Sequence, residues 1–253
     1  MRSFPPTPAI RRAAPTIPTP AHRDAPELLD TLADVPAAAL AGNLRDIRNV
    51  NRYLGGTAVV LAHLPALLTE MPRGATVSVL DVATGSGDIP RALVRWGRRH
   101  GYDLRVVATD IADDVLAVAR RETADEPCIV VETCDVRALP YRDRAFDIVT
   151  CSLALHHLAQ ADAVRALAEM GRVARAGVIV NDLVRSWPGY VGAWLVGVCT
   201  TTNRLTRHDA PLSVLRAWTP DELRAMAAEA GLESVTVTPH AFCRQALVAH
   251  GAA

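Results

Sequence analysis

Short apolar, β-branched runs alternate with helical segments through the middle of the chain, and no other feature limits the possible folds as strongly. Strands are predicted in the five runs 77–83, 104–109, 128–133, 146–151 and 177–182. Helices are predicted between them at 89–99, 112–122 and 159–173. Such alternation is typical of a parallel sheet with helices on both faces, so the expected fold class is α/β. Two closing strands, at 234–238 and 241–249, are expected to form a hairpin.

The two ends of the predicted sheet region carry features of their own. Residues 1–26 contain seven prolines, which fix φ and lack a backbone donor, so a disordered Pro/Arg-rich tail is expected. Apolar residues then recur every three or four positions, and residues 27–72 are predicted to form an N-terminal helical cap. Residues 73–253 are expected to form the main domain. An insertion at 185–218, after the fifth strand, is expected to cover a substrate.

Charge and cysteine content narrow the classes of function. All 27 basic residues are arginine and they balance 27 acidic residues, which argues against a broad nucleic-acid surface and excludes a Schiff-base or P-loop lysine. The five cysteines form no C-x-x-C pair and are expected to be free thiols in a reducing compartment. We expect a cytoplasmic monomer or homodimer with a small-molecule substrate, without a nucleic-acid partner or a membrane span.

Residues 79–88 are the most informative segment, because there the first predicted strand runs directly into a glycine-rich loop. Small residues there let a ligand approach the backbone, and the next helix offers it unpaired N–H groups. A dinucleotide site would need a small residue where Pro90 stands. Asp81 and Asp88 suit a cationic ligand better than a pyrophosphate, and Asp110 ends the second strand where a carboxylate can hold ribose hydroxyls. These features indicate a positively charged, ribose-bearing ligand without phosphate, which describes S-adenosylmethionine (SAM).

The chain resembles the class I SAM-dependent methyltransferases over about residues 77–250. The segments that carry the resemblance are Asp81-x-Ala83-x-Gly85-x-Gly87, Asp110, Cys134-Asp135-Val136, Phe146–His157 and Arg172–Gly177. The resemblance implies a Rossmann-like, seven-stranded, mostly parallel sheet with an antiparallel last strand, helices on both faces and SAM as the cofactor. The cofactor-binding residues that it implies are Asp81, Ala83, Thr84, Gly85, Gly87, Asp110, Ile111, Asp135, Val136 and Ser152. Asp110 would hold the ribose, Ile111 would pack on the adenine, and Asp135 would accept from its amino group.

The sequence says less about the molecule that receives the methyl group and about the residues that would activate it. Transfer to oxygen needs a base, and histidine is the usual one at neutral pH, so His157 and His208 are the candidate catalytic residues, with His156 beside them. Asn181-Asp182 alone does not define a metal site, and no metal is predicted. Residues 49–56 resemble the cap helix of bacterial methyltransferases that modify phenolic or quinone-like secondary metabolites, including the ubiquinone/menaquinone type. The expected function is therefore SAM-dependent methylation of a phenolic, quinone-like or polyketide small molecule, with O-methylation favoured over C-methylation.

Several alternatives remain open at this stage. A non-catalytic SAM-binding protein fits the same motifs, and an NAD-dependent oxidoreductase fits the strand–glycine–helix pattern less well. Arg52 is expected either to reach the SAM carboxylate or to stay solvated. The aromatic residues of the insertion are expected either to line an apolar lid over the substrate or to pack within it; they are Trp187, Tyr190, Trp194 and Trp218.

Overall fold

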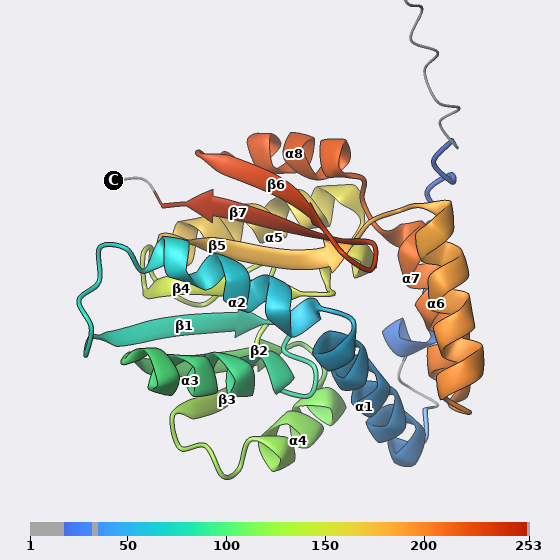
Figure 1. Cartoon of the computed structure of the whole chain (residues 1–253), viewed down its shortest axis with the longest axis horizontal. Coiled ribbons are helices and arrows are strands. Elements are labelled where there is room, and N and C mark those ends of the chain that lie inside the picture. Colours follow the sequence, from blue (N-terminus) through green and yellow to red (C-terminus); the bar gives the residue numbers. More distant parts are fainter. Residues whose placement is uncertain (1–17, 32–34, 252–253) are drawn as a thin grey trace, which may run out of the picture.

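The computed structural model describes residues 18–31 and 35–251 (Figure 1). The strands of this part form one seven-stranded sheet in the order β3-β2-β1-β4-β5-β7-β6. Their bounds are β1 Thr76–Val82, β2 Asp103–Asp110, β3 Ile129–Thr133, β4 Phe146–Ser152, β5 Ala174–Leu183, β6 Val235–His240 and β7 Arg244–His250. The predicted Rossmann-like α/β fold is confirmed, with strand ends within a few residues of those expected.

Strand direction places the functional edge of the sheet. β1 pairs in parallel with β2 and β4, and β4 pairs in parallel with β5. β7 runs antiparallel between β5 and β6, as expected for the last strand. Because the carboxyl ends of parallel strands meet at one edge, the segments that follow β1, β2, β4 and β5 gather on the same side of the molecule.

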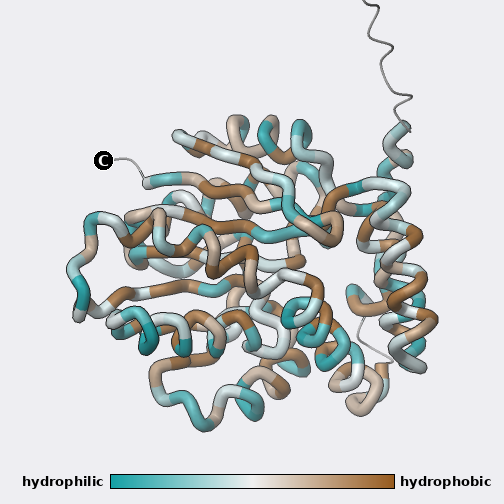
Figure 2. Tube along the Cα trace, viewed as in Figure 1, coloured by the Kyte–Doolittle hydropathy of each residue, from teal (hydrophilic) through white to brown (hydrophobic). Residues whose placement is uncertain are grey.

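Helices cover both faces of the sheet. α2 (Gly56–Leu67) and α3 (Asp88–His100) pack on one face, and α5 (Gln160–Val173) and α8 (Pro220–Glu229) pack on the other. α4 (Asp113–Glu122) lies against β2, β3 and the N-terminal helix. Figure 2 shows hydrophobic residues along the strands between these layers. The two cores therefore lie on opposite faces of the sheet.

The predicted N-terminal cap divides into two parts with different roles. α2 packs on the sheet, where Val60 and Leu64 are fully buried beside β-strand residues such as Val79. α2 is apolar around most of its circumference, and such a helix is buried rather than laid over an opening. The prediction that all of residues 27–72 form a cap is therefore wrong for α2. The cap consists of the short 3-10 helix η1 (Leu28–Asp30) and the amphipathic α1 (Ala37–Tyr53).

The prediction of a disordered tail is wrong for residues 18–26, while residues 1–17 lie outside the described residues. The His22 ring stacks on Trp218 with centroids 4.7 Å apart. The Arg23 N–H donates to the carbonyl of Leu215, and the carbonyl of Pro20 accepts from the buried Arg185 side chain at 3.0 Å. Prolines lack N–H donors, but their carbonyls still satisfy buried arginines, which the composition alone did not reveal.

The insertion after β5 is a pair of helices, α6 (Trp187–Thr200) and α7 (Arg204–Arg216). The two helices pack together, and α7 also contacts η1 and α1. Figure 1 shows them beside α1 at the carboxyl edge of the sheet. Among the described helices, none combines the length and the apolar character needed to cross a membrane.

Candidate active site

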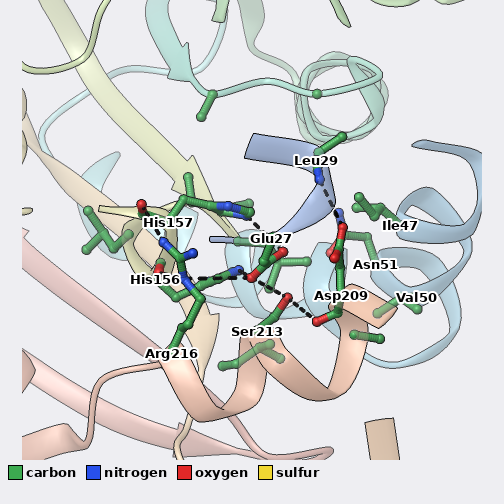
Figure 3. Close-up of a pocket in the computed structure, with 18 of the residues that line it drawn as sticks. Glu27, Leu29, Ile47, Val50, Asn51, His156, His157, Asp209, Ser213 and Arg216 are labelled. Atoms are coloured by element: carbon green, nitrogen blue, oxygen red, sulfur yellow. Dashed lines mark hydrogen bonds and ion pairs between the residues drawn. The ribbon is translucent and has the colours of Figure 1, made fainter. Parts of the chain in front are cut away.

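A large cavity opens where the carboxyl edge of the sheet meets α1, α6 and α7. Its volume is about 1160 Å³. Pockets for one small ligand commonly measure roughly 300–1,000 Å³, so this cavity has room for a cofactor and a second molecule. One side is formed by the loop after β1 and the ends of β2 and β4, and the other by η1, α1, α6 and α7. Figure 3 shows part of the second side.

The loop after β1 has the backbone shape that its glycines predict. Ala83, Gly85 and Gly87 have positive φ values of 52°, 57° and 75°. A Cβ on Gly87 would lie 2.7 Å from Thr123 Cγ2. Glycine is therefore required at this position both by the positive φ and by the lack of space for a side chain. Ala83, Thr84 and Gly85 line the cavity. Gly87 lies outside its lining and supports the turn into α3.

Two carboxylates beside this loop are buried. Thr150 Oγ1 donates to Asp81 Oδ1 at 2.5 Å, and burial raises the pKa of Asp81 to about 7. Asn51 Nδ2 donates to Asp88 Oδ2 at 3.1 Å, and burial raises the pKa of Asp88 as well. Both carboxylates would be stabilised by a cationic ligand in the cavity. Asn51 was missed from the sequence because α1 reaches the loop only in the folded chain.

Asp110 stands at the end of β2 as predicted. The Gly85 N–H donates to its Oδ2 and the Ala112 N–H to its Oδ1, both at 3.2 Å. Burial raises the pKa of Asp110. Each oxygen keeps acceptor capacity for a hydroxyl group. Ile111 is 61% exposed and lies at the rim of the same cavity, so it is free to contact a bound ring.

The third predicted cofactor segment is present but differently engaged. Asp135 and Val136 line the cavity, yet both carboxylate oxygens of Asp135 accept from the Arg137 guanidinium. This hydrogen bonding lowers the pKa of Asp135, so its oxygens are shared with a neighbour before any ligand binds. Ser152 also lines the cavity, and its buried Oγ has no hydrogen-bond partner in the described part of the chain. An orphaned hydroxyl of this kind fits a polar ligand group.

Two histidines stand on the acceptor side of the cavity, in the 3-10 helix η3 (Leu155–His157) after β4. Nδ1 of His156 lies 2.6 Å from Asp182 Oδ1, and Nδ1 of His157 lies 2.7 Å from Asp30 Oδ1. Arg216 holds the turn by donating to the carbonyls of both histidines. The His157 side chain is 23% exposed, whereas that of His156 is 3% exposed. His157 is therefore the more accessible of the pair.

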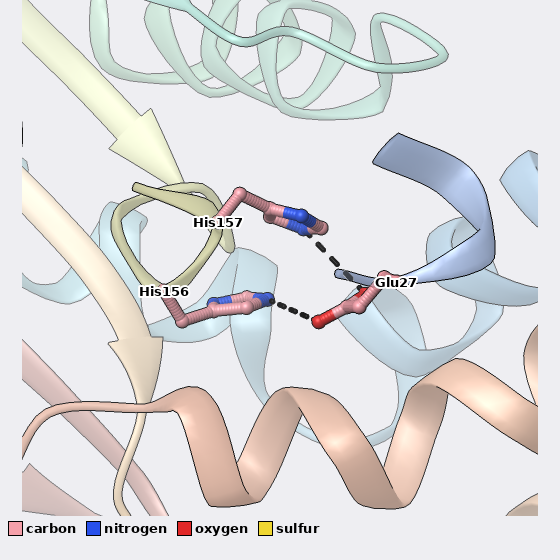
Figure 4. Close-up of side chains that lie close together, drawn as sticks. All are labelled: Glu27, His156 and His157. Atoms are coloured by element: carbon pink, nitrogen blue, oxygen red, sulfur yellow. Dashed lines mark ion pairs between the residues drawn. The ribbon is translucent and has the colours of Figure 1, made fainter. Parts of the chain in front are cut away.

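Glu27 completes this group from the N-terminal segment, as Figure 4 shows. Its Oε1 lies 3.9 Å from His156 Nε2, and its Oε2 lies 3.9 Å from His157 Nε2. Ser213 Oγ donates to Oε1 at 2.8 Å. Burial raises the pKa of Glu27 to about 7. Nothing in the residues around Glu27 marked it in advance, because its partners are contributed by η3 and α7.

Several expected site residues lie elsewhere. His208 is 50% exposed in its side chain, binds the neighbouring Asp209 and does not line the cavity, so it is wrong as a catalytic candidate. Arg52 is exposed and its guanidinium lies over the Tyr53 ring, not at the cofactor loop.

Of the two alternatives for the aromatic residues of the insertion, lining of the cavity is not what the structure shows, since none of the four is among its lining residues. Trp187 and Trp194 are 44% and 48% exposed, and Trp218 is buried with Nε1 donating to the Leu155 carbonyl. The cavity wall is mainly aliphatic on this side; its apolar side chains include Ile47, Val50, Leu54, Leu155, Pro188, Val196, Val214 and Phe242. α6 turns its tryptophans outward because its inward positions pack on α7 and are filled by small residues such as Gly197.

The chain has recognisable relatives among known proteins. Residues 79–177 match a family model described as a methyltransferase domain. Over 112 residues the chain is 36% identical to the ubiquinone/menaquinone biosynthesis C-methyltransferase UbiE of Cupriavidus pinatubonensis, which covers 43% of this chain and 44% of that protein. The chain therefore matches less than half the length of this relative.

Solved structures show the same fold. The carbon methyltransferase of CurJ has a TM-score of 0.59 at 12% identity, covering 78% of this chain and 54% of that one. The magnesium protoporphyrin IX methyltransferase of Synechocystis, solved with bound S-adenosylhomocysteine (SAH), has a TM-score of 0.54 at 15% identity and covers 79% and 84% of the two chains. At these identities the likeness concerns the fold.

Proposed function

Since its matched domain belongs to the class I SAM-dependent methyltransferases and SAM is its cofactor, we propose that this protein methylates the hydroxyl oxygen of a small, largely apolar acceptor. The acceptor class is phenolic, quinone-like or polyketide. One observation carries the proposal: a single cavity has the cofactor loop on one side and a carboxylate-oriented histidine on the other.

The cofactor side consists of residues that fit SAM. Ala83, Thr84 and Gly85 allow close approach to the backbone, and Asp110 offers two acceptor oxygens for ribose hydroxyls. The buried acids Asp81 and Asp88 lie where a sulfonium or ammonium group would relieve the cost of their charge. SAM supplies an electrophilic methyl group, and its displacement by an acceptor oxygen leaves SAH and a methyl ether.

The acceptor side supplies the base. Asp30 accepts from Nδ1–H of His157, which leaves a lone pair on Nε2 directed into the cavity. We propose that this Nε2 accepts the proton of the acceptor hydroxyl. The O–H bond breaks and its electron pair stays on oxygen. His157 becomes an imidazolium paired with Asp30. The proton then returns to solvent. His156, buried against Asp182, positions the turn that carries His157.

The side chains of the cavity wall support the proposed class of acceptor. Aliphatic side chains from α1, α6 and α7 surround the space next to His157, which favours an apolar ring bearing few polar groups. A phenolic hydroxyl is far more acidic than an aliphatic one, so a histidine can take up its proton as the new carbon–oxygen bond forms. The family model matches residues 79–177 and does not reach α1, α6 or α7, so the proposal of oxygen as the methylated atom rests on the base and the wall.

The test is incubation with SAM labelled in its methyl group and a panel of phenols, hydroquinones and aromatic polyketides. Mass spectrometry should find a labelled product, and NMR should place the label in a methoxy group. His157→Ala should reduce turnover by roughly 10²–10⁴-fold. His100→Ala is the matched control, since His100 is exposed at the far end of α3 and stacks on Trp96.

Three results would count against the proposal. A labelled carbon–methyl product would correct the methylated atom, and full activity in His157→Ala would remove the base. SAM binding without product from any acceptor class would favour a non-catalytic SAM-binding protein.

A further inference from the structure

Three metal-ligating side chains converge on one point of the cavity wall. Glu27, His156 and His157 each contribute a ligand atom, and these atoms all lie within 4.8 Å of one another (Figure 4). They are brought together from η1 and η3, which are far apart in the sequence. Glu27 and His156 are each 3% exposed, so this group is built into the protein rather than gathered on its surface.

The orientation of both imidazoles is fixed by a second carboxylate. Asp182 accepts from Nδ1 of His156 at 2.6 Å, and Asp30 accepts from Nδ1 of His157 at 2.7 Å. Both Nε2 lone pairs therefore face the carboxylate of Glu27, across 3.9 Å in each case. That separation is too long for a hydrogen bond. No hydrogen bond joins Glu27 to either imidazole, and a carboxylate–histidine arrangement of this kind orients imidazoles that bind metals.

The charged groups around this point also favour a bound cation. Four carboxylates surround the point, those of Glu27, Asp30, Asp182 and Asp209. The guanidinium of Arg216 faces them: its Nε lies 4.0 Å from Glu27, and its Nη1 pairs with Asp30 at 2.9 Å. Glu27 is buried beside Asp30 and Asp209, so a cation bound at this point would offset the cost of its charge.

We propose that Glu27, His156 and His157 form a binding site for a divalent transition-metal ion. Two imidazoles and one carboxylate are a ligand set used by zinc and by non-haem iron, with the remaining coordination positions open. Metal–ligand bonds are about 2.0–2.2 Å long. For one ion to reach all three ligand atoms, each atom would have to move towards the others by roughly a few tenths of an ångström. All three residues line the cavity, so the open positions are accessible to a small molecule there.

The site and the proposed base use the same lone pair, that of His157 Nε2. A protein molecule with an ion bound would hold an acceptor oxygen as a ligand of the ion, and a metal-free molecule would deprotonate it through His157. Only this consequence rests on the proposed function. The binding test therefore uses neither SAM nor acceptor, and its failure would leave methyl transfer untouched.

The experiment is titration of chelator-treated, full-length protein with Co²⁺, followed by visible absorption, and with Zn²⁺, followed by calorimetry. One ion per chain should bind, with a d–d spectrum of nitrogen and oxygen ligands. Glu27→Gln, which keeps the side-chain shape, should weaken binding at least tenfold. Asp30→Asn, which changes the carboxylate that His157 Nδ1, Arg216 Nη1 and the Glu27 N–H share, should weaken it by roughly 10–100-fold.

The control variant is His63→Ala. His63 and His240 are another close histidine pair in the described part, with Nε2 atoms 2.9 Å apart. This variant should bind Co²⁺ as the wild type does. Absence of stoichiometric binding, binding unchanged in both Glu27→Gln and Asp30→Asn, loss in His63→Ala, or thiolate charge-transfer bands would each overturn the proposal. Circular dichroism and SAH binding verify that each variant is folded.

Discussion

Buried carboxylates dominate the cavity, and their partners decide what each one does. Asp110 receives two backbone N–H groups, so its position is set by the loop and the strand end that it joins. Glu27 receives one hydroxyl and faces two imidazole nitrogens beyond hydrogen-bond distance. The first arrangement fixes a ligand contact in place, whereas the second leaves a charge that protonation or a cation must compensate.

Asp110→Ala should weaken SAH binding by about 1.5–3 kcal/mol, because it removes a charged acceptor for ribose hydroxyls. Calorimetry measures this directly. Asp103→Ala is the matched control, since Asp103 begins the same strand at the opposite edge of the sheet. Equal affinity in the wild type and Asp110→Ala would place the ribose elsewhere in the cavity.

Glu27→Gln should change how the stability of the metal-free protein depends on pH. The pKa of Glu27 is raised from 4.5 to about 7 in the fold, so the folded state binds this proton more tightly than the unfolded chain does. Its stabilising contribution is complete below pH 4.5 and is lost as pH rises through 7. A shift of this size corresponds to about 3 kcal/mol.

Urea unfolding at pH 5 and pH 8 in the presence of a chelator tests this expectation. The difference in unfolding free energy between wild type and Glu27→Gln should move in favour of the variant at the higher pH. The exposed Glu70→Gln is the control and should track the wild type. Parallel pH profiles for wild type and Glu27→Gln would show that Glu27 is not protonated in the fold.

Residues whose role depends on local sequence were predictable, and those positioned by distant segments were not. Asp81 and Asp110 lie at the carboxyl ends of β1 and β2, and Gly85 lies in the loop after β1, so their place at the sheet edge follows from chain direction. Glu27 and Asp30 act through histidines more than a hundred positions away, which no local pattern encodes. His208 has an adjacent acid, as a base would, but its side chain leaves α7 on the outer surface.

At the scale of elements, periodicity predicted that helices form but not which surface each one covers. α1 and α2 follow one another with a short break at Gly55, yet α1 lies over the cavity and α2 lies on the sheet. The difference lies in composition: α1 has a polar face and α2 has almost none. The chain before η1 shows the converse, since its proline-rich composition hid a segment that docks on α7.

A chain beginning at Glu27 should be less stable than one beginning at Pro18. The shorter chain loses acceptors for two buried arginines, because the carbonyls of Pro20 and Ala25 bind Arg185 and Arg216. Hydrogen bonds to charged groups contribute roughly 1.5–3 kcal/mol each, and for a domain of this size each kcal/mol lowers the Tm by about 2–4 °C. Calorimetry should therefore show a fall of several degrees. Equal Tm values would mean that solvent replaces these contacts at no cost.

The whole molecule combines a rigid sheet with a wall built from separate stretches of chain. The sheet and its two cores hold the cofactor loop, while η1, α1, α6 and α7 enclose the acceptor side. Closing such a wall excludes water and strengthens electrostatic interactions in the site. We therefore expect the wall, and not the sheet, to respond when the cavity fills.

Hydrogen exchange with and without SAH tests this expectation. SAH should protect η1, α1, α6 and α7 in addition to the loop at 83–88, while α2, which already packs on the sheet, should change little. Exchange of α8, on the far face of the sheet, serves as the internal control. Protection limited to the loop and the end of β2 would show that the acceptor meets an open surface.

The division of the cavity between two sets of segments bears on how such proteins diverge. Wall positions such as Val50, Val196 and Val214 lie on helices outside the sheet, whereas the loop that accommodates the cofactor follows β1. A lineage can therefore exchange wall side chains, and with them the range of compounds admitted, while the chemistry at the sheet edge is inherited unchanged. The hydrogen bond from Asn51 in α1 to Asp88 joins the wall to the cofactor side, so we expect Asn51 to be less free to change than the other wall positions.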